Sequence, residues 1–224
     1  LNQNSIFRAK SKAPSTVVFA VFPKRFKQIT YRNAPAIGIA RVSSERRKYI
    51  PFGFVDANTV IVDSAQAIYT PTIFIFGLLS SLIHMVWVKA TSGALESRIR
   101  YSSALSYNNF PFPPISDSQK QELEKHVYRI LEEREKHSEK TLAQLYDPDK
   151  MPDGLREAHH QNDLAIERCY RSKPFESDEE RLEYLFKMYE QMIEEEKNKG
   201  TLFAIEGKPK KNKVENLRHV LQYS

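Results

Sequence analysis

The chain has 224 residues, of which 41% are hydrophobic and 11% aromatic; this is ordinary for a folded protein and excludes disorder over the whole length. A single cysteine, Cys169, excludes an internal disulfide and a zinc site built from several thiolates. The formal net charge is +6, but residues 1–115 hold 14 Lys and Arg against 4 Asp and Glu, whereas residues 116–224 hold 20 against 24. This division predicts that only the basic first half faces a polyanion.

The beginning of the chain and its single thiol bear on the compartment. No basic stretch followed by a short apolar run opens the chain, so we expect no export signal. The first residue is Leu1 rather than Met, and we interpret the chain as part of a longer protein. One cysteine is typical of a reducing compartment, and we therefore expect a cytoplasmic protein in which Cys169 is a small buried hydrophobic residue.

Short β-branched and aromatic runs dominate residues 16–79, and Pro, Gly, Asn or Asp interrupts nearly every gap between them. This pattern predicts strands over residues 16–22, 36–42, 49–55, 59–62, 65–69 and 73–79. Residues 64–88 contain no charged side chain and are long enough to cross a bilayer. Pro71, Gly77 and the Ser80-Ser81 pair favour instead a strand, a serine cap and a helix from Leu82 to Thr91, with no membrane partner.

The pattern changes after the proline-rich segment 108–114, which we interpret as a domain boundary and a stiff linker. Ser116 or Asp117 can cap a helix, a short turn contains Leu142 and Leu145, and a second long helix starts near Pro152. A third begins with a capping box from Ser177 to Glu180 and ends at Gly200. The predicted fold class is α+β: a β-rich mixed domain of short strands with a helix over residues 1–113, a small helical bundle over 114–199 and a basic extension over 200–224.

A search for catalytic motifs gives a negative prediction. A DNA methyltransferase needs a glycine-rich loop for S-adenosylmethionine and an Asn/Asp-Pro-Pro-aromatic loop for the flipped base. The segment from Asn109 to Phe112 has Phe110 where the second motif has its first proline, and no cofactor motif accompanies it. The adjacent His159 and His160 diverge by about 100° on a helix and so do not share a metal easily. We predict no catalytic, metal or cofactor site in this chain.

Two segments are candidates for contacting DNA. One joins two predicted strands and mixes hydroxyls with cations, a composition that holds phosphate oxygens: Arg41, Ser43, Ser44, Arg46 and Arg47. In the other, an extended conformation places Glu96, Arg98 and Arg100 on one face. Glu can accept from the cytosine amine and Arg can donate twice to guanine in the major groove. The alternatives are a solvated basic turn for the first segment and a local ion pair for the second.

Together these segments resemble the target recognition domain and C-terminal helical domain of MmeI-like type IIG restriction-modification enzymes and their stand-alone adenine methyltransferase relatives. The residues that carry the resemblance are Val42 to Pro51, Gly53-Phe54, Asp63-Ser64-Ala65, His84 to Val88, Arg98 to Ser102, Tyr107 to Pro111 and Leu145 to Pro148. They extend over about residues 16–195, most of the chain.

The resemblance implies roles for a few residues. In that family the segment similar to Glu96-x-Arg98 discriminates one base pair, and the position of Arg100 acts at another together with the position near Ser64. It also implies a methyltransferase domain on the same polypeptide, before Leu1, that binds S-adenosylmethionine and methylates adenine. Any nuclease domain would lie before that, and the sequence leaves open whether one is fused.

The sequence therefore predicts a non-catalytic unit that binds double-stranded DNA for an adenine-specific methyltransferase. Ser64, Glu96, Arg98 and Arg100 would read bases, while the Arg41 to Arg47 segment would hold the backbone. The alternative is a protein-interaction module whose helical half docks a partner subunit.

Overall fold

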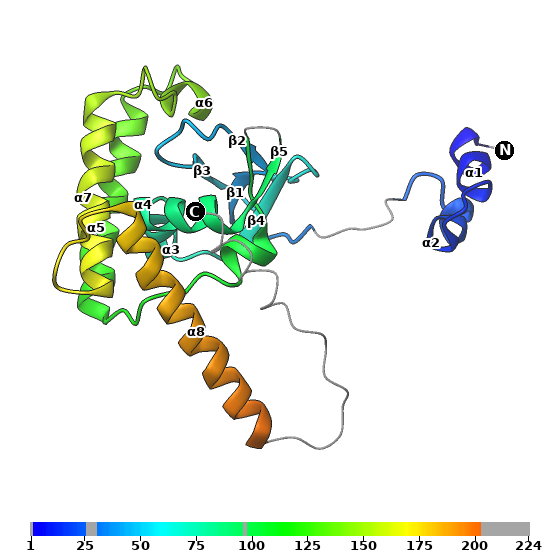
Figure 1. The fold of residues 1–224 in the computed structure, drawn as a ribbon. Helices are drawn as coiled ribbons and strands as arrows, with labels where there is room; N and C mark the ends of the chain where they lie inside the picture. The colour runs from blue at the N-terminus through cyan, green and yellow to red at the C-terminus, as the bar shows by residue number, and fades with distance from the viewer. Residues whose placement is uncertain (1, 26–30, 96–97, 203–224) are drawn as a thin grey trace.

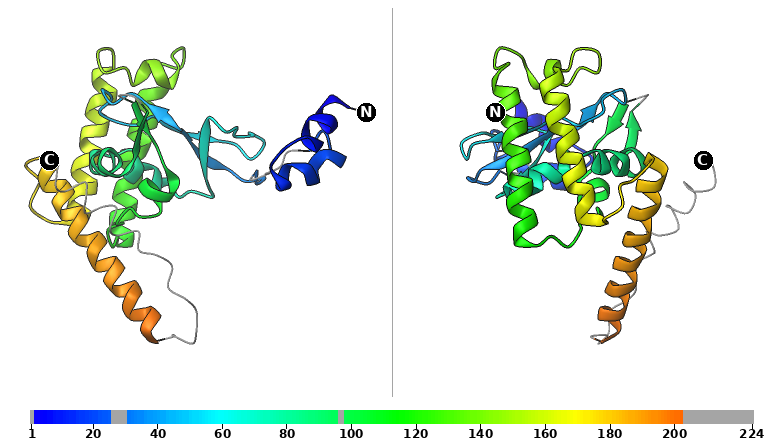
Figure 2. Two further views of the ribbon diagram at one scale, coloured as in Figure 1. Left: turned by 45° about the vertical axis from the view of Figure 1, so that its right-hand side comes forward. Right: turned by 90° about the vertical axis from the view of Figure 1, so that its left-hand side faces the viewer.

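The computed structural model describes residues 2–25, 31–95 and 98–202. A small helical unit at the N-terminal end lies apart from the body of the fold (Figure 1; Figure 2). It consists of α1 (Gln3–Ala9), α2 (Pro14–Val17) and the 3-10 helix η1 (Val18–Val21). The prediction of a strand over residues 16–22 is wrong, because Pro14 occupies the first turn of α2, where its fixed φ angle favours a helix.

The basic half contains two antiparallel sheets of three strands each, besides its helices. The first has the order β3-β1-β4 and contains β1 (Ala36–Ala40), β3 (Phe52–Val55) and β4 (Ala65–Tyr69). The second has the order β2-β6-β5 and contains β2 (Val42–Ser43), β5 (Gly93–Leu95) and β6 (Arg98–Arg100). The predicted strand over residues 59–62 is instead part of a loop. Asp56 accepts hydrogen bonds there from the Asn58 amide and the Thr59 hydroxyl, at 2.8 and 3.0 Å, and so closes a turn.

Two short helices, α3 (Ile73–Leu79) and α4 (Leu82–Thr91), form the buried centre. The predicted strand over 73–79 is wrong, since a continuous apolar run does not distinguish a buried strand from a buried helix. The serine-capped helix is confirmed, with the Ser81 hydroxyl accepting from the His84 amide at 3.4 Å. No described helix is by itself long and apolar enough to cross a membrane; α3 and α4 meet that test only as a pair, bent by 60°.

The second half is helical, and with it the α+β class is confirmed. α5 (Asp117–Glu135) begins at a capping box formed by Ser116 and Gln119, and the short α6 (Leu142–Leu145) follows. α7 (Asp153–Tyr170) begins after Pro152, as predicted, and packs beside α5 (Figure 1). α8 (Asp178–Leu202) extends away from the body and continues past Gly200, two residues beyond its predicted end.

The two halves share their hydrophobic cores. One core combines Ile37 and Phe52 of the first sheet with Val127 of α5 and Leu155 of α7. The other places Trp87 of α4 against α8, with its ring 5.4 Å from that of Phe186. The proline-rich segment belongs to this second core as well: Phe110 is buried, and the Pro111 carbonyl accepts from the Tyr170 hydroxyl at 3.1 Å. The helical half therefore packs against the basic half through shared hydrophobic cores, and the domain boundary at residues 108–114 stays a prediction.

Candidate nucleic-acid interface

The central strand of the second sheet presents two arginines to solvent. β6 pairs with β2 on one side and β5 on the other, with Arg100 opposite Val42 and Gly93. Ile99 is 7% exposed and belongs to the core, whereas Arg98 and Arg100 are exposed. The predicted alternation of exposed and buried side chains is confirmed for these three residues. Because β6 is paired with a strand on each side, the backbone that carries the two arginines is fixed.

Glu96, the third predicted base reader, lies outside the described residues, as does Ser97. Their role as base readers stays a prediction.

The two sheets meet beside β6. The Arg41 amide donates to the Ser64 carbonyl at 3.0 Å, and the Tyr101 amide donates to the Arg41 carbonyl at 2.8 Å. Ser64, exposed at the start of β4, is thereby joined through Arg41 to the end of β6. The backbone of Arg41 thus links the predicted reading residue Ser64, just before β4, to the end of β6, which carries Arg98 and Arg100, although these segments are far apart in the sequence.

An ion pair that the sequence did not predict lies at this junction. The Arg41 guanidinium is 3.0 Å from the Asp63 carboxylate, whose side chain is 98% exposed. The pair places the guanidinium donors of Arg41 beside the carboxylate of Asp63, the residue before Ser64. Its only signal in the sequence is the position of Asp63, one of just four acidic residues in the basic half.

The basic turn between β2 and β3 contacts the helical half through Arg46 and Arg47. Arg46 contacts both carboxylate oxygens of Asp149, at 3.1 and 2.9 Å, with both side chains more than half exposed. Arg47 donates to the Tyr146 and Ala143 carbonyls and to the Ser43 hydroxyl. Ser43 is only 4% exposed, so its hydroxyl is used inside the protein.

Ser44 has a local role as well, since its hydroxyl accepts from the Arg46 amide at 3.3 Å. Of this predicted phosphate-binding group, Arg46 is the most available to a ligand. The backbone-contacting role of the group remains a prediction, which the internal contacts of Ser43 and Arg47 do not favour.

A buried polar chain fixes the sheets to the helices. Arg134 of α5 donates to the Phe52 carbonyl at 2.8 Å and to the Tyr146 hydroxyl, which lies 2.6 Å from His159 Nε2. His159 Nδ1 lies 3.1 Å from the Ser80 carbonyl, an acceptor, so Nδ1 carries the proton and Nε2 accepts from the tyrosine. Burial lowers the pKa of His159 to about 3, which keeps this ring neutral beside the Arg134 cation.

A second set of buried hydrogen bonds joins Tyr49, which lies shortly before β3, to α7. The Tyr49 hydroxyl donates to the Asp163 carboxyl at 2.7 Å, and the Leu82 amide donates to its other oxygen at 2.7 Å. Burial raises the pKa of Asp163 to about 7 and raises that of Tyr49 as well. These links make the platform under the arginines rigid, and rigidity is what a reading surface needs.

Two further buried titratable groups, His84 and Cys169, lie in the hydrophobic core. Burial lowers the pKa of His84 to about 3, and its Nε2 lies 3.2 Å from the Tyr101 hydroxyl. Cys169 is buried, with a thiol pKa raised by burial, as expected of a small core residue. Within the described ranges no three His, Cys, Asp or Glu side chains are grouped to hold a metal.

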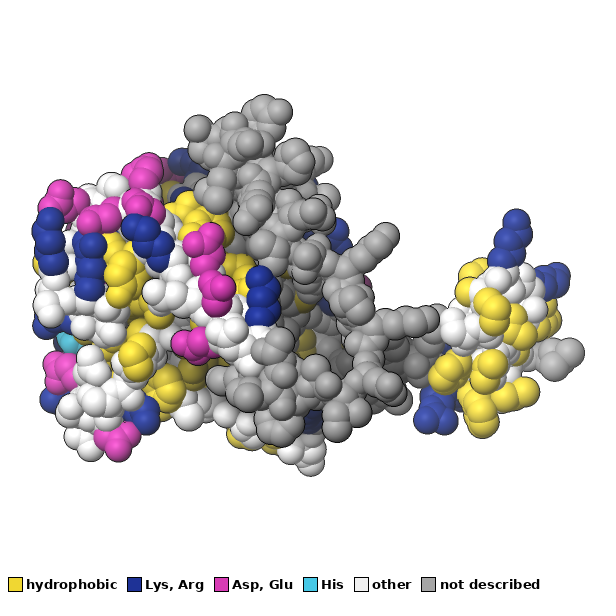
Figure 3. Space-filling view, turned by 60° about the horizontal axis from the view of Figure 1, so that its bottom comes forward, with side chains coloured by type: hydrophobic (Ala, Val, Ile, Leu, Met, Phe, Trp, Pro, Cys, Tyr) yellow, Lys and Arg dark blue, Asp and Glu magenta, His cyan; other side chains and the backbone are white. Residues whose placement is uncertain are grey.

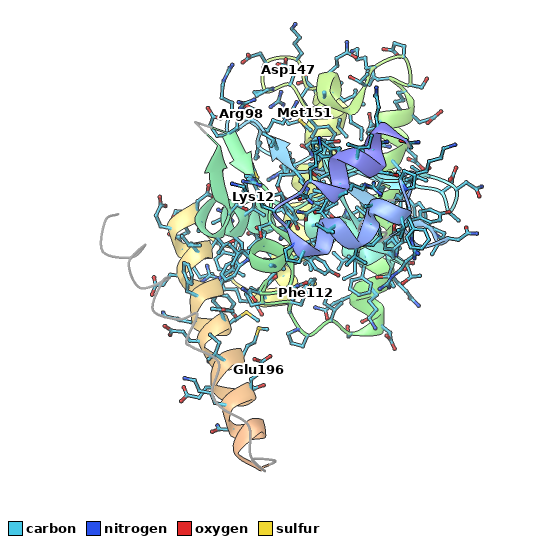
Figure 4. The ribbon with its side chains drawn as sticks, turned by 90° about the vertical axis from the view of Figure 1, so that its right-hand side faces the viewer. Lys12, Arg98, Phe112, Asp147, Met151 and Glu196 are labelled. Atoms are coloured by element: carbon cyan, nitrogen blue, oxygen red, sulfur yellow. The ribbon has the colours of Figure 1, made fainter. Side chains whose placement is uncertain are left out.

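Figure 4 shows Arg98 at the same end of the molecule as Asp147 and Met151, which lie between α6 and α7. Glu196, on the acidic α8, lies at the opposite end (Figure 4). The visible face of the N-terminal unit in Figure 3 carries basic and apolar side chains, with no acidic ones.

Comparison with known proteins supplies the family. The chain matches the model of the MmeI target recognition domain over residues 1–114 and that of the MmeI C-terminal domain over residues 115–195. It is 43% identical over 187 residues to DNA methyltransferase A of Bacillus subtilis (strain 168), a match that covers 84% of this chain and 21% of that protein.

A solved structure is similar as well. The type IIL restriction-modification enzyme MmeI in complex with DNA matches with a TM-score of 0.81 and 37% identity, over 85% of this chain and 25% of that chain. The chain thus spans about a fifth to a quarter of these two relatives.

Proposed function

Because this chain belongs to the family of MmeI target recognition and C-terminal domains, we propose that it reads a base sequence in duplex DNA for an adenine-specific DNA methyltransferase of a restriction-modification system. The observation that carries the proposal is the pair of exposed arginines on the central strand of a sheet held from behind by helices. A solved relative of similar fold is bound to DNA, which supports a nucleic-acid partner. These findings do not favour the alternative of a module that only docks a protein subunit.

In this proposal Arg98 and Arg100 donate to guanine edges in the major groove, each good contact contributing about 1–3 kcal/mol of discrimination. Glu96 accepts from a cytosine amine, and Ser64 contacts an edge beside Arg100. We assign Arg41 to the same group rather than to the phosphate contacts, because its backbone is hydrogen-bonded to Ser64 and Tyr101 and its guanidinium is paired with Asp63. A guanidinium that a carboxylate already holds loses less conformational entropy on binding a base than an unrestrained guanidinium does.

Contacts to the DNA backbone would come from the basic turn. Arg46 is placed for this if its guanidinium exchanges Asp149 for a phosphate, since both side chains are solvent-accessible. Residues 114–199 support the sheets, and residues 200–224 receive no role.

Methyl transfer belongs, in this proposal, to a separate domain of a longer polypeptide that uses S-adenosylmethionine. This chain orients the duplex against that domain so that the target adenine reaches it. A restriction-modification protein of this kind would act in the cytoplasm, where the DNA is.

Binding of the chain to random-sequence duplexes, followed by fluorescence anisotropy across a range of salt concentrations, tests the proposal. We expect binding that weakens steeply with salt, because each neutralised phosphate releases counterions. Replacement of both Arg98 and Arg100 by Ala should reduce the preference among sequences recovered from the pool. The matched control is the double replacement of Lys125 and Lys173, exposed lysines of the helical half, which removes the same charge. Equal effects of the two double variants on sequence preference would contradict the proposal.

A further inference from the structure

A hollow of about 440 Å³ lies outside the reading group, between the edge strand β4 and the π-helix η2 (Ser103–Tyr107). Its polar lining consists of Arg32, Tyr69, Ser103, Tyr107 and Asn108, and residues 67–68 of β4 complete it. None of the described residues that line the hollow is acidic. Single-turn π-helices are rare and occur often at functional sites, and here η2 brings Ser103 and Tyr107 to the same wall.

The cation in this hollow is held in place by an aromatic ring. The guanidinium carbon of Arg32 lies 5.7 Å from the centroid of the Tyr69 ring, and the Arg32 amide donates to the Tyr69 hydroxyl at 3.2 Å. Within the described part of the chain, no carboxylate lies within ion-pair distance of Arg32. Its charge is therefore available to an anion.

The neighbouring groups are neutral donors. The Ser103 hydroxyl and the Asn108 amide are exposed, and neither side chain hydrogen-bonds to another described residue. Arginine, serine, asparagine and tyrosine are among the side chains that contact phosphate oxygens and sugars in DNA complexes. The volume exceeds that of an isolated phosphate and suits a stretch of sugar–phosphate backbone.

Two connections in the chain link the hollow to the predicted base-reading residues. η2 begins three residues after Arg100, and the Gln66 side-chain amide donates to the Tyr101 carbonyl at 3.3 Å, which ties β4 to the approach to η2. From Ser64 to the hollow at residues 67–69 the strand covers roughly 10–17 Å, at about 3.3 Å per residue. A duplex carries a phosphate charge about every 1.7 Å of its axis, so backbone flanking the bases read by Arg100 is within reach.

We propose that this hollow binds a phosphodiester of the DNA just outside the bases that are read, with Arg32 neutralising it and Ser103 and Asn108 donating to its oxygens. The inference rests on the proposed function, because the phosphodiester belongs to the same duplex. It adds an anchor that fixes the register of the sheet on DNA without reading sequence.

The test uses anisotropy titrations of the 224-residue chain with two duplexes of unrelated sequence. Arg32→Gln should reduce the slope of log K against log salt by about 0.9 and weaken binding roughly fivefold at 0.15 M salt, to the same extent on both duplexes. Asn108→Ala should weaken binding by about two- to tenfold and leave the slope unchanged, since it removes a neutral hydrogen bond. Arg32 and Asn108 are exposed, so neither change should alter the circular dichroism spectrum.

The control is Lys173→Gln, which removes one charge from an exposed lysine paired with Glu176. If Arg32→Gln changes the salt slope no more than this control while the unmodified chain binds DNA, the hollow does not hold a phosphate and the proposed function stands. If the unmodified chain binds neither duplex, the proposed function itself fails and the hollow with it. A loss that differs between the two duplexes would make Arg32 a base reader and overturn the inference.

Discussion

The buried carboxyl of Asp163 should make the stability of the protein depend on pH in a way that one substitution removes. Burial raises its pKa from 3.8 to about 7, against the lowering effect of its bonds from Tyr49 and Leu82. In the unfolded chain the Asp163 carboxyl keeps its ordinary pKa of 3.8. Between pH 3.8 and pH 7, folding is therefore accompanied by the binding of a proton at this carboxyl. The stability contributed by the protonated group is complete below pH 4 and is lost as the pH rises through 7.

The magnitude follows from the two pKa values. Their separation corresponds to about 4 kcal/mol in total, of which about 2.5 kcal/mol falls between pH 5 and pH 8. Asp163→Asn cannot ionise, but its amide oxygen can still accept from Leu82 and its NH₂ can donate to the Tyr49 oxygen. Relative to the unmodified protein, the variant should therefore gain about 2.5 kcal/mol in unfolding free energy from pH 5 to pH 8.

Urea unfolding followed by circular dichroism measures this difference at each pH. The comparison with Asp163→Leu is informative, because leucine leaves the Tyr49 hydroxyl and the Leu82 amide unpaired and should destabilise the protein throughout the range. A difference between Asp163→Asn and the unmodified protein that stays constant from pH 5 to pH 8 would refute the assignment of a raised pKa to this carboxyl.

Three further substitutions test the packing that holds the reading sheet. Gly77→Ala should destabilise the protein by about 1–3 kcal/mol in urea unfolding, because the new Cβ would lie 2.7 Å from Val127 Cγ2; an unchanged midpoint would show that α3 and α5 can separate without cost. Ser116→Ala should cost about 1 kcal/mol by removing the cap of α5, and restoring the cap with Asp should recover most of it. Arg134→Leu should cost about 1–3 kcal/mol, since the Phe52 carbonyl loses its buried donor; amide exchange in β3 that stays as slow as before would contradict this.

The helical half was the more predictable part of the fold. Its amphipathic period and the capping signals at Ser116 and Ser177 are local properties, and the helices begin where these residues place them. The strand at 65–69 was also predicted, and so was β1 within the predicted run 36–42, which the structure divides at Arg41 between the two sheets. The run at residues 73–79 was misassigned, since its helix is buried on nearly all sides and shows no polar face to give it a period.

The candidate site was predictable only where it depends on alternation along one strand. Arg98 and Arg100 face solvent because Ile99 between them enters the core, and the sequence contains that pattern. The contacts of Arg47 with α6 and of Arg41 with Asp63 depend on residues from other elements brought close by the fold. Composition could not separate cations available to DNA from cations already used inside the protein.

Sequencing the duplexes that the protein retains from a random pool tests the central claim most directly. We predict that the unmodified chain enriches one motif, and that Glu96→Lys combined with Arg98→Asp changes that motif at one base pair while the other positions stay the same. An unchanged motif, recovered with undiminished affinity, would contradict the claim that this strand reads DNA.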